Sequence, residues 1–117
     1  MIRMPAITLF AALVSGSFLM APACVAAEGS VTIESPKDGA QLDAMQPTQL
    51  VYEVMPGPDG NHVHVYVDDK EVGILRQLKG SYTLQTLSAG KHDICIKVVN
   101  KGHTPIGLQR CVNVNVE

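Results

Sequence analysis

The stretch His62-Val63-His64-Val65-Tyr66-Val67 alternates three valines with two histidines and a tyrosine. Successive side chains of a β-strand point to opposite faces, so the valines share one face, and His62, His64 and Tyr66 share the other. Branched side chains at every second position favour a strand packed against a core. The stretch therefore predicts a central β-strand over residues 62–67.

The same alternation recurs along the chain, between clusters of Gly, Pro, Asp and Asn. Helical periodicity is hard to find after Glu28. We expect the other strands around residues 31–34, 50–54, 71–75, 81–87, 94–98 and 112–116. About seven short strands at this spacing predict an all-β domain, folded as an antiparallel β-sandwich.

The first 27 residues differ from the rest in composition. Arg3 precedes an uncharged apolar run over residues 6–20, and Val25-Ala26-Ala27 offers the small residues that a signal peptidase reads. The run is shorter than the roughly 20 residues that cross a bilayer. We expect residues 1–27 to be a cleaved signal peptide, residues 28–117 to form one domain, and the mature protein to be periplasmic or secreted, without a transmembrane segment.

A competing interpretation is that Cys24 carries a lipid that anchors the protein to a membrane. The residues before it, Ala21-Pro22-Ala23, lack the usual leucine and argue against an anchor. Cleavage after Ala27 removes Arg3 and leaves 8 basic against 11 acidic side chains. Because this balance is negative, nucleic acid is not an expected partner.

Three segments resemble the immunoglobulin-like β-sandwich domains of exported bacterial proteins, which include fibronectin III-like modules. They are Ser35–Ala40, Val65–Asp69 and Leu87–Ile94. The resemblance implies an immunoglobulin-like fold but no activity. The chain has no Trp for the core, and His92 stands where related folds commonly have a tyrosine that ties the chain to the backbone at a corner. The resemblance thus makes His92 a candidate corner residue.

With Cys24 removed, Cys95 and Cys111 are the remaining cysteines of a protein sent to an oxidising compartment. A hairpin centred near His103 places them directly opposite each other, with both sulfurs on the face away from the core. Cross-strand Cβ atoms lie about 4.5–5.5 Å apart, close to disulfide range. We predict a structural Cys95–Cys111 disulfide. The alternative is a redox pair or a copper thiolate site, although no Cys-X-X-Cys motif supports it.

Four histidines are the feature that points to chemistry: His62, His64, His92 and His103. His62 and His64 lie two apart on one strand, so their Cα atoms are about 6.6–6.8 Å apart on the same face, close enough to share a metal ion. A third ligand would come from His103 or His92. The hypothesis is therefore a copper or zinc site.

Two further side chains bear on the choice of metal. Met55 and Asp59 precede His62 in a loop; imidazole with a thioether favours copper, and imidazole with a carboxylate favours zinc. The opposing interpretation is that His62, His64 and Tyr66 decorate a solvent-facing sheet surface, as is usual for the face opposite a core. On that interpretation His92 and His103 make ordinary corner and loop hydrogen bonds.

Motifs for catalysis are lacking in the sequence. There is no serine in a glycine-flanked elbow and no glycine-rich phosphate loop. Asp68-Asp69 with Glu71 is the nearest approach to a carboxylate cluster, and in a turn between strands we interpret these acids as solvated. We expect a protein that is not an enzyme.

Two functions follow from these observations. The first is a binding module that contacts an unknown protein or surface ligand through one sheet face or through the end loops at residues 56–61 and 101–107, with Asp59, Asn61, Lys101 and Thr104 as candidate contact residues. The alternative is a periplasmic copper- or zinc-binding protein centred on His62 and His64. A carbohydrate-binding sandwich is a weaker third interpretation, because the chain has no Trp.

Overall fold

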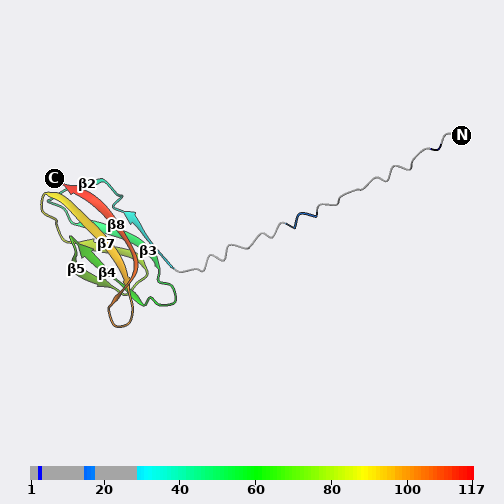
Figure 1. Ribbon diagram of the computed structural model, residues 1–117. Coiled ribbons are helices and arrows are strands. Elements are labelled where there is room, and N and C mark those ends of the chain that lie inside the picture. Colours follow the sequence, from blue (N-terminus) through cyan, green and yellow to red (C-terminus); the bar gives the residue numbers. More distant parts are fainter. Residues whose placement is uncertain (1–2, 4–14, 18–28) are drawn as a thin grey trace.

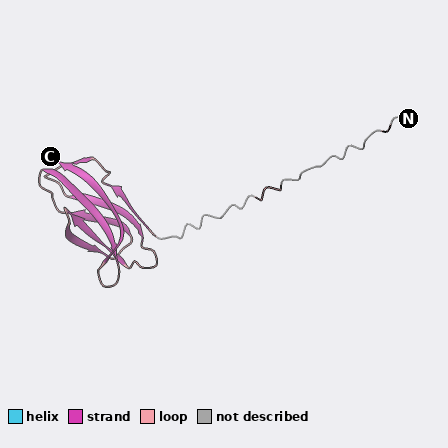
Figure 2. Cartoon of the chain, viewed as in Figure 1, coloured by secondary structure: helices cyan, strands magenta, loops and turns pink. Residues whose placement is uncertain are grey.

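The regular elements of the domain are all strands. The computed structural model describes residues 3, 15–17 and 29–117, so most of the predicted signal peptide, with Cys24, lies outside the described residues. Within the described ranges no helix is long and apolar enough to cross a membrane. Figures 1 and 2 show the strands, which are β1 (Ser30–Ser35), β2 (Ala40–Leu42), β3 (Thr48–Met55), β4 (His62–Val67), β5 (Lys70–Leu75), β6 (Lys79–Leu84), β7 (Gly90–Val99) and β8 (Pro105–Val116).

The strands form two sheets that pack as a sandwich. One sheet has the order β1-β3-β6, and the other has the order β2-β8-β7-β4-β5. All pairings are antiparallel except that of the short β2 with β8. The strand predicted to be central, β4, lies between β7 and the edge strand β5. The prediction of an antiparallel all-β sandwich is confirmed, and the fold is that of an immunoglobulin-like domain.

The alternation within β4 decides which side chains enter the core. Val63 and Val65 are fully buried, Val67 is 9% exposed, and all three belong to the apolar cluster between the sheets. Leu50 and Tyr52 enter the same cluster from β3. Burial of each such side chain contributes about 1.5–3 kcal/mol, so the sandwich is held mainly by these alternating positions.

Some elements differ from the sequence expectation. Residues 29–117 contain eight strands. The three-residue β2 is too short to show alternation, and it is recognisable only by its pairing with β8. Strand β8 begins at Pro105, so the last three of the seven residues expected to form a loop at 101–107 are strand. The tight turn at Asp68-Asp69 is as expected, and both residues have positive φ (51° and 65°), as two-residue hairpin loops require.

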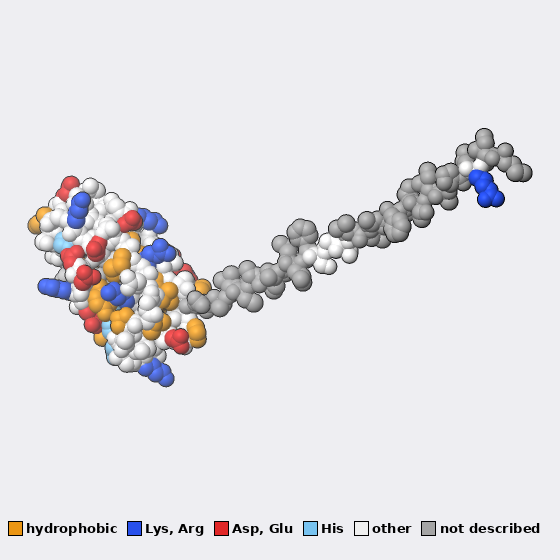
Figure 3. Space-filling model, viewed as in Figure 1, with side chains coloured by type: hydrophobic (Ala, Val, Ile, Leu, Met, Phe, Trp, Pro, Cys, Tyr) orange, Lys and Arg blue, Asp and Glu red, His pale blue; other side chains and the backbone are white. Residues whose placement is uncertain are grey.

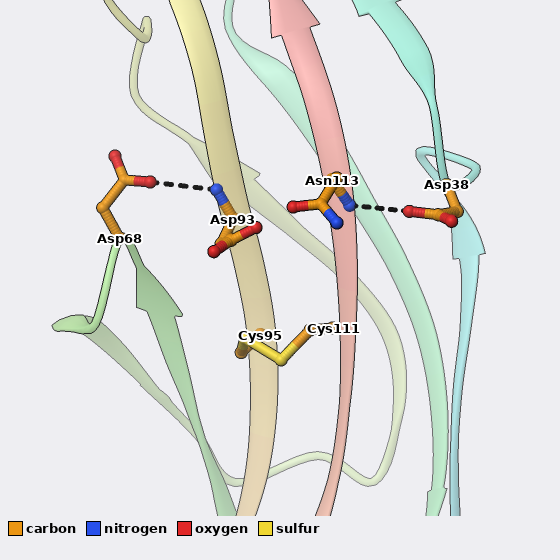
Figure 4. Close-up of a disulfide and its surroundings, with 6 residues drawn as sticks. All are labelled: Asp38, Asp68, Asp93, Cys95, Cys111 and Asn113. Atoms are coloured by element: carbon orange, nitrogen blue, oxygen red, sulfur yellow. Dashed lines mark hydrogen bonds between the residues drawn. A yellow bond between two sulfur atoms is a disulfide. The ribbon is translucent and has the colours of Figure 1, made fainter.

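The predicted disulfide joins β7 to β8. Cys95 is the cross-strand partner of Cys111, and the two are 16 positions apart in the sequence. Figure 4 shows the bridge between the two strands, with the Asp68 carboxylate accepting a hydrogen bond (2.9 Å) from the N–H of Asp93, which precedes Cys95 on β7. On β8, the N–H of Asn113 donates to the Asp38 carboxylate in the same way (2.8 Å). The predicted Cys95–Cys111 disulfide is confirmed.

Candidate metal centre

Three of the four histidines converge on one point. His62 Nε2 lies 3.1 Å from His64 Nε2 and 3.1 Å from His103 Nδ1, and His64 Nε2 lies 3.0 Å from His103 Nδ1. The His103 ring stands edge-on to that of His62, with the centroids 4.5 Å apart. Three ring nitrogens thus form a nearly equilateral triangle at the start of β4.

Strand β4 positions two of the three rings. His62 and His64 are on the face opposite the core, as the alternation predicts, yet each is only 2% exposed. Their neighbour on β7, Val99, is paired with His62 and is also fully buried. The interpretation of this surface as solvent-facing is therefore wrong, because the outer face of the sheet is covered at this end.

The third ring comes from the hairpin loop between β7 and β8. This loop is closed by hydrogen bonds from the N–H groups of His103 and Thr104 to the backbone and side-chain oxygens of Asn100 (3.0 Å each). His103 has φ 64°, in the left-handed region, which turns its side chain at the loop tip. The pairing of β7 with β8 is irregular next to the loop, between Lys97 and Val99. Such irregularities bend a strand. The loop end thus departs from regular pairing where His103 approaches β4.

The opposite nitrogens of the two strand histidines face other side chains. His62 Nδ1 is 2.9 Å from Asn61 Oδ1, an acceptor, and this contact favours the tautomer with the proton on Nδ1 and the lone pair on Nε2. His64 Nδ1 is 3.4 Å from Glu71 Oε1. This buried nitrogen makes no hydrogen bond among the described residues. Both strand histidines therefore direct Nε2 toward the triangle.

Hydrogen bonding alone does not satisfy the triangle. Each ring nitrogen of a neutral imidazole carries either one proton or one lone pair. If one of the three nitrogens carries a proton, its N–H can donate with good geometry to only one of the other two. If two of them carry protons, the two N–H groups point at each other. Burial lowers the pKa of His62, and the nearby His103 ring and Arg76 lower it further, which disfavours an added proton there. A metal ion, in contrast, accepts all three lone pairs at once.

His92 does not join this cluster. Its Nδ1 donates to Asp68 Oδ2 and its Nε2 donates to the carbonyl oxygen of Ser88 (2.7 Å). The bond to Ser88, four residues upstream, ties the corner to the backbone, as the resemblance implies for this position. Asp68 is therefore engaged by His92 and is not simply a solvated turn acid.

The group Ser88, His92 and Asp68 also has the composition of a catalytic triad. Ser88 Oγ lies 3.4 Å from His92 Nε2. Because that nitrogen already donates its proton to the Ser88 carbonyl, it has no lone pair with which to activate the hydroxyl. The geometry is that of a corner and not of an activated serine.

The other predicted candidates lie near the cluster or on the opposite sheet. Met55 ends β3 in the three-stranded sheet, 60% exposed, and pairs there with Ser30. Among the described His, Cys, Asp and Glu side chains, the convergent group holds only the three histidines, so Asp59 is not part of it. Asp59, Asn61 and Lys101 line a depression of about 430 Å³ between residues 58–61 and 100–102.

The two loops that bound this depression lie at the same end of the sandwich, away from the C-terminus (Figure 1). Thr104 closes the hairpin loop through its bonds to Asn100. The face of the domain in Figure 3 carries acidic and basic side chains interspersed, without a large field of one sign. The predicted contact loops and the histidine cluster thus occupy one end of the molecule.

The comparisons with known proteins establish the fold. No protein-family model and no curated protein sequence matches the chain. Among solved structures, fibronectin(III)-like modules of Clostridium thermocellum CbhA are similar with a TM-score of 0.63 and 17% identity, over 77% of this chain and 47% of that one. An engineered protein gives a TM-score of 0.55 and 23% identity, over 79% of this chain and 21% of that one.

A further similar structure is an extracellular domain from B. thetaiotaomicron, with a TM-score of 0.50, 16% identity and coverage of 75% of this chain and 14% of that one. The chain therefore spans less than half the length of each of these structures. Identities this low show the fold alone, and the domain has the immunoglobulin-like, fibronectin III-like fold.

Proposed function

We propose that the protein is an exported, non-catalytic immunoglobulin-like module that binds a copper or zinc ion through His62, His64 and His103. The observation that carries this proposal is the triangle of ring nitrogens at 3.0–3.1 Å. Two of its members are buried on a rigid strand, and the third is delivered from a separate loop. Structural histidines seldom need three nitrogens directed at one point, whereas a metal ion does.

The donor set limits the metal. Three neutral imidazoles suit zinc and copper, and hard oxygen-seeking ions such as Ca²⁺ and Mg²⁺ prefer carboxylates and carbonyls. An ion about 2.0–2.1 Å from each nitrogen would see neighbouring nitrogens roughly 95° apart. The three ligands then occupy one side of the ion, which leaves coordination positions open for water or another ligand.

Export is supported by independent features. The Cys95–Cys111 disulfide is of the kind that persists in oxidising compartments, and an extracellular domain is among the structures with a similar fold. The amino-terminal segment, residues 1–27, has the composition of a signal peptide. In the periplasm or outside the cell, zinc and copper are accessible without competition from cytoplasmic thiols.

The depression between the two end loops supports a second role, as the contact surface for a partner. Its lining includes the charged side chains of Asp59 and Lys101 and the amides of Asn61 and Asn100. Loops on a rigid sandwich are the usual place for recognition. Because Asn61 precedes one metal ligand and Gly102 precedes another, metal site and contact surface would be built from the same two loops.

Native mass spectrometry of the purified protein with Zn²⁺ or Cu²⁺ tests the metal proposal. The wild type should bind one ion. A residue that hydrogen-bonds to a metal ligand typically contributes roughly 10–100-fold to metal affinity, and His103→Gly, which removes a ligand, should weaken binding by more than that. Glycine suits the positive φ at this position, so the loop should keep its shape. Lys101→Ala, in the same loop, is the matched control and should bind like the wild type. Equal binding by the wild type and His103→Gly would refute the site.

A further inference from the structure

The environment of His64 contains a feature that the three ligands do not explain. His64 Nδ1, on the side of the ring away from the triangle, is buried and has no hydrogen bond among the described residues. A buried polar atom without a partner costs about 1–3 kcal/mol, so it points to a function or to an interaction that forms in another state. The atom facing it is Glu71 Oε1, at 3.4 Å.

A β-bulge is what brings Glu71 to this face. Strand β5 pairs Ile74 with His64 and Gly73 with Val65, but the next pair is Glu71 with Tyr66, so Val72 is an extra residue without a partner. Without the bulge, Val72 would oppose Tyr66, and Glu71 would fall on the face that holds the core valines. The bulge therefore moves the carboxylate to the face that carries the histidines.

The position of Glu71 excludes a role as a fourth ligand to the same point. Its carboxylate lies next to Nδ1, whereas Nε2 of His64 faces the other two histidines. The side chain is 44% exposed, so it is free to move the few tenths of an ångström needed for a hydrogen bond. Asn61 occupies the equivalent position behind His62, at 2.9 Å.

We propose that Glu71 is the positioning residue of the metal site: its carboxylate accepts the Nδ1 proton of His64 and thereby holds the Nε2 lone pair toward the ion. This inference rests on the proposed metal-binding function. When a metal ion withdraws electron density from an imidazole, the remaining N–H becomes a better donor, and a carboxylate partner strengthens the bond to the metal. The bulge at Val72 then has the role of placing Glu71 behind His64, and it adds no side chain to the core.

A charge-matched pair of variants tests this role. Glu71→Gln and Asp69→Asn each remove one negative charge from the same turn and strand, but only Glu71 faces His64, and asparagine tolerates the positive φ of residue 69. Zinc affinity, measured by competition with a chromophoric chelator, should fall about 10–100-fold in Glu71→Ala, by less in Glu71→Gln, and not at all in Asp69→Asn.

A second measurement separates positioning from general stability. In metal-free wild type, ¹⁵N chemical shifts should show the proton of His64 on Nδ1, and Glu71→Ala should show a mixture of the two tautomers. Equal zinc affinity and the same tautomer in wild type and Glu71→Ala would overturn the role of Glu71 and leave the metal site standing. Failure of the wild type to bind either ion would overturn the site, and the role of Glu71 with it.

Discussion

At the level of single residues, His92 is a histidine whose surroundings favour the cation. Both of its ring nitrogens face oxygens that only accept hydrogen bonds, the Asp68 carboxylate and the Ser88 carbonyl, so the doubly protonated ring satisfies both contacts. The hydrogen bond to Asp68 raises the pKa of His92, and the same bond lowers the pKa of Asp68. The corner is therefore most stable where both groups are charged.

This pair predicts a pH-dependent contribution to stability. Because the pKa of His92 is raised on folding, its contribution is complete below about pH 6.5 and is lost as the pH rises through the raised value. Because the pKa of Asp68 is lowered, its contribution is present above about pH 4 and is lost as the pH falls through the lowered value. Between these limits the pair contributes at most about 1 kcal/mol, since Asp68 is half exposed.

Urea unfolding of the wild type and His92→Gln at pH 5.5 and pH 8.5 measures this contribution. The difference in free energy of unfolding between the two proteins should be larger at pH 5.5. His62 acts in the opposite direction, because a lowered histidine pKa opposes stability at low pH, but it is common to both proteins and cancels in the difference. A difference that is the same at both pH values would contradict the prediction.

The histidines also show what the alternation of residues predicts and what it does not. The alternation in β4 correctly placed His62 and His64 on one face, but the same pattern suggested that this face meets solvent. Both rings are buried, and the hairpin loop that carries His103, 41 positions along the chain from His62, lies against them. A periodicity of two describes which face a side chain occupies and carries no information about what distant segment covers that face.

At the scale of elements, the β7–β8 hairpin was predictable because two signals agreed. The alternation of Ile94 and Ile96 with Cys95, and the equal spacing of both cysteines from His103, predicted the register that the structure has from Gly90 to Lys97; the shift between Lys97 and Val99 was not predicted. Strand β5 was different, because the extra residue Val72 shifts the register of the residues that follow it. The neighbouring Gly73 is the one local sign of a bulge, but a glycine within a strand gives neither the extra residue nor the face to which Glu71 moves. The position of Glu71 behind His64 thus required the structure.

The disulfide should contribute strongly to the stability of this hairpin and of the domain. A bridge that closes a loop of about 15 residues removes chain entropy from the unfolded state worth roughly 3 kcal/mol. The variant Cys95→Ala/Cys111→Ala should therefore unfold at lower urea concentration, with a free energy of unfolding about 3 kcal/mol smaller. Chemical reduction of the wild type should give a similar loss. An unchanged midpoint in both cases would show that the unfolded chain is not constrained by the bridge.

In the molecule as a whole, the rigid sandwich holds the strands and the loop that carry the three histidines at one end. The core between the sheets fixes β4, and the disulfide joins the two strands that lead to the hairpin loop. The His62 and His64 rings are therefore held firmly, whereas His103 lies on an exposed loop. In the proposed metal site, two fixed ligands and one from a loop would let an ion enter and leave without opening the core.

This arrangement predicts that metal and folding are linked. The unfolded chain cannot hold residues 62, 64 and 103 together, so an ion that binds only the folded protein adds about 2.7 kcal/mol of stability at a free concentration 100 times its Kd. For a domain of this size that corresponds to a rise in Tm of roughly 10–20 °C. Zn²⁺ should raise the Tm of the wild type and of Lys101→Ala by this amount, and should leave that of His103→Gly nearly unchanged. Equal shifts in the wild type and His103→Gly would mean that the ion binds elsewhere, because the imidazole of His103 is the group that the glycine variant lacks.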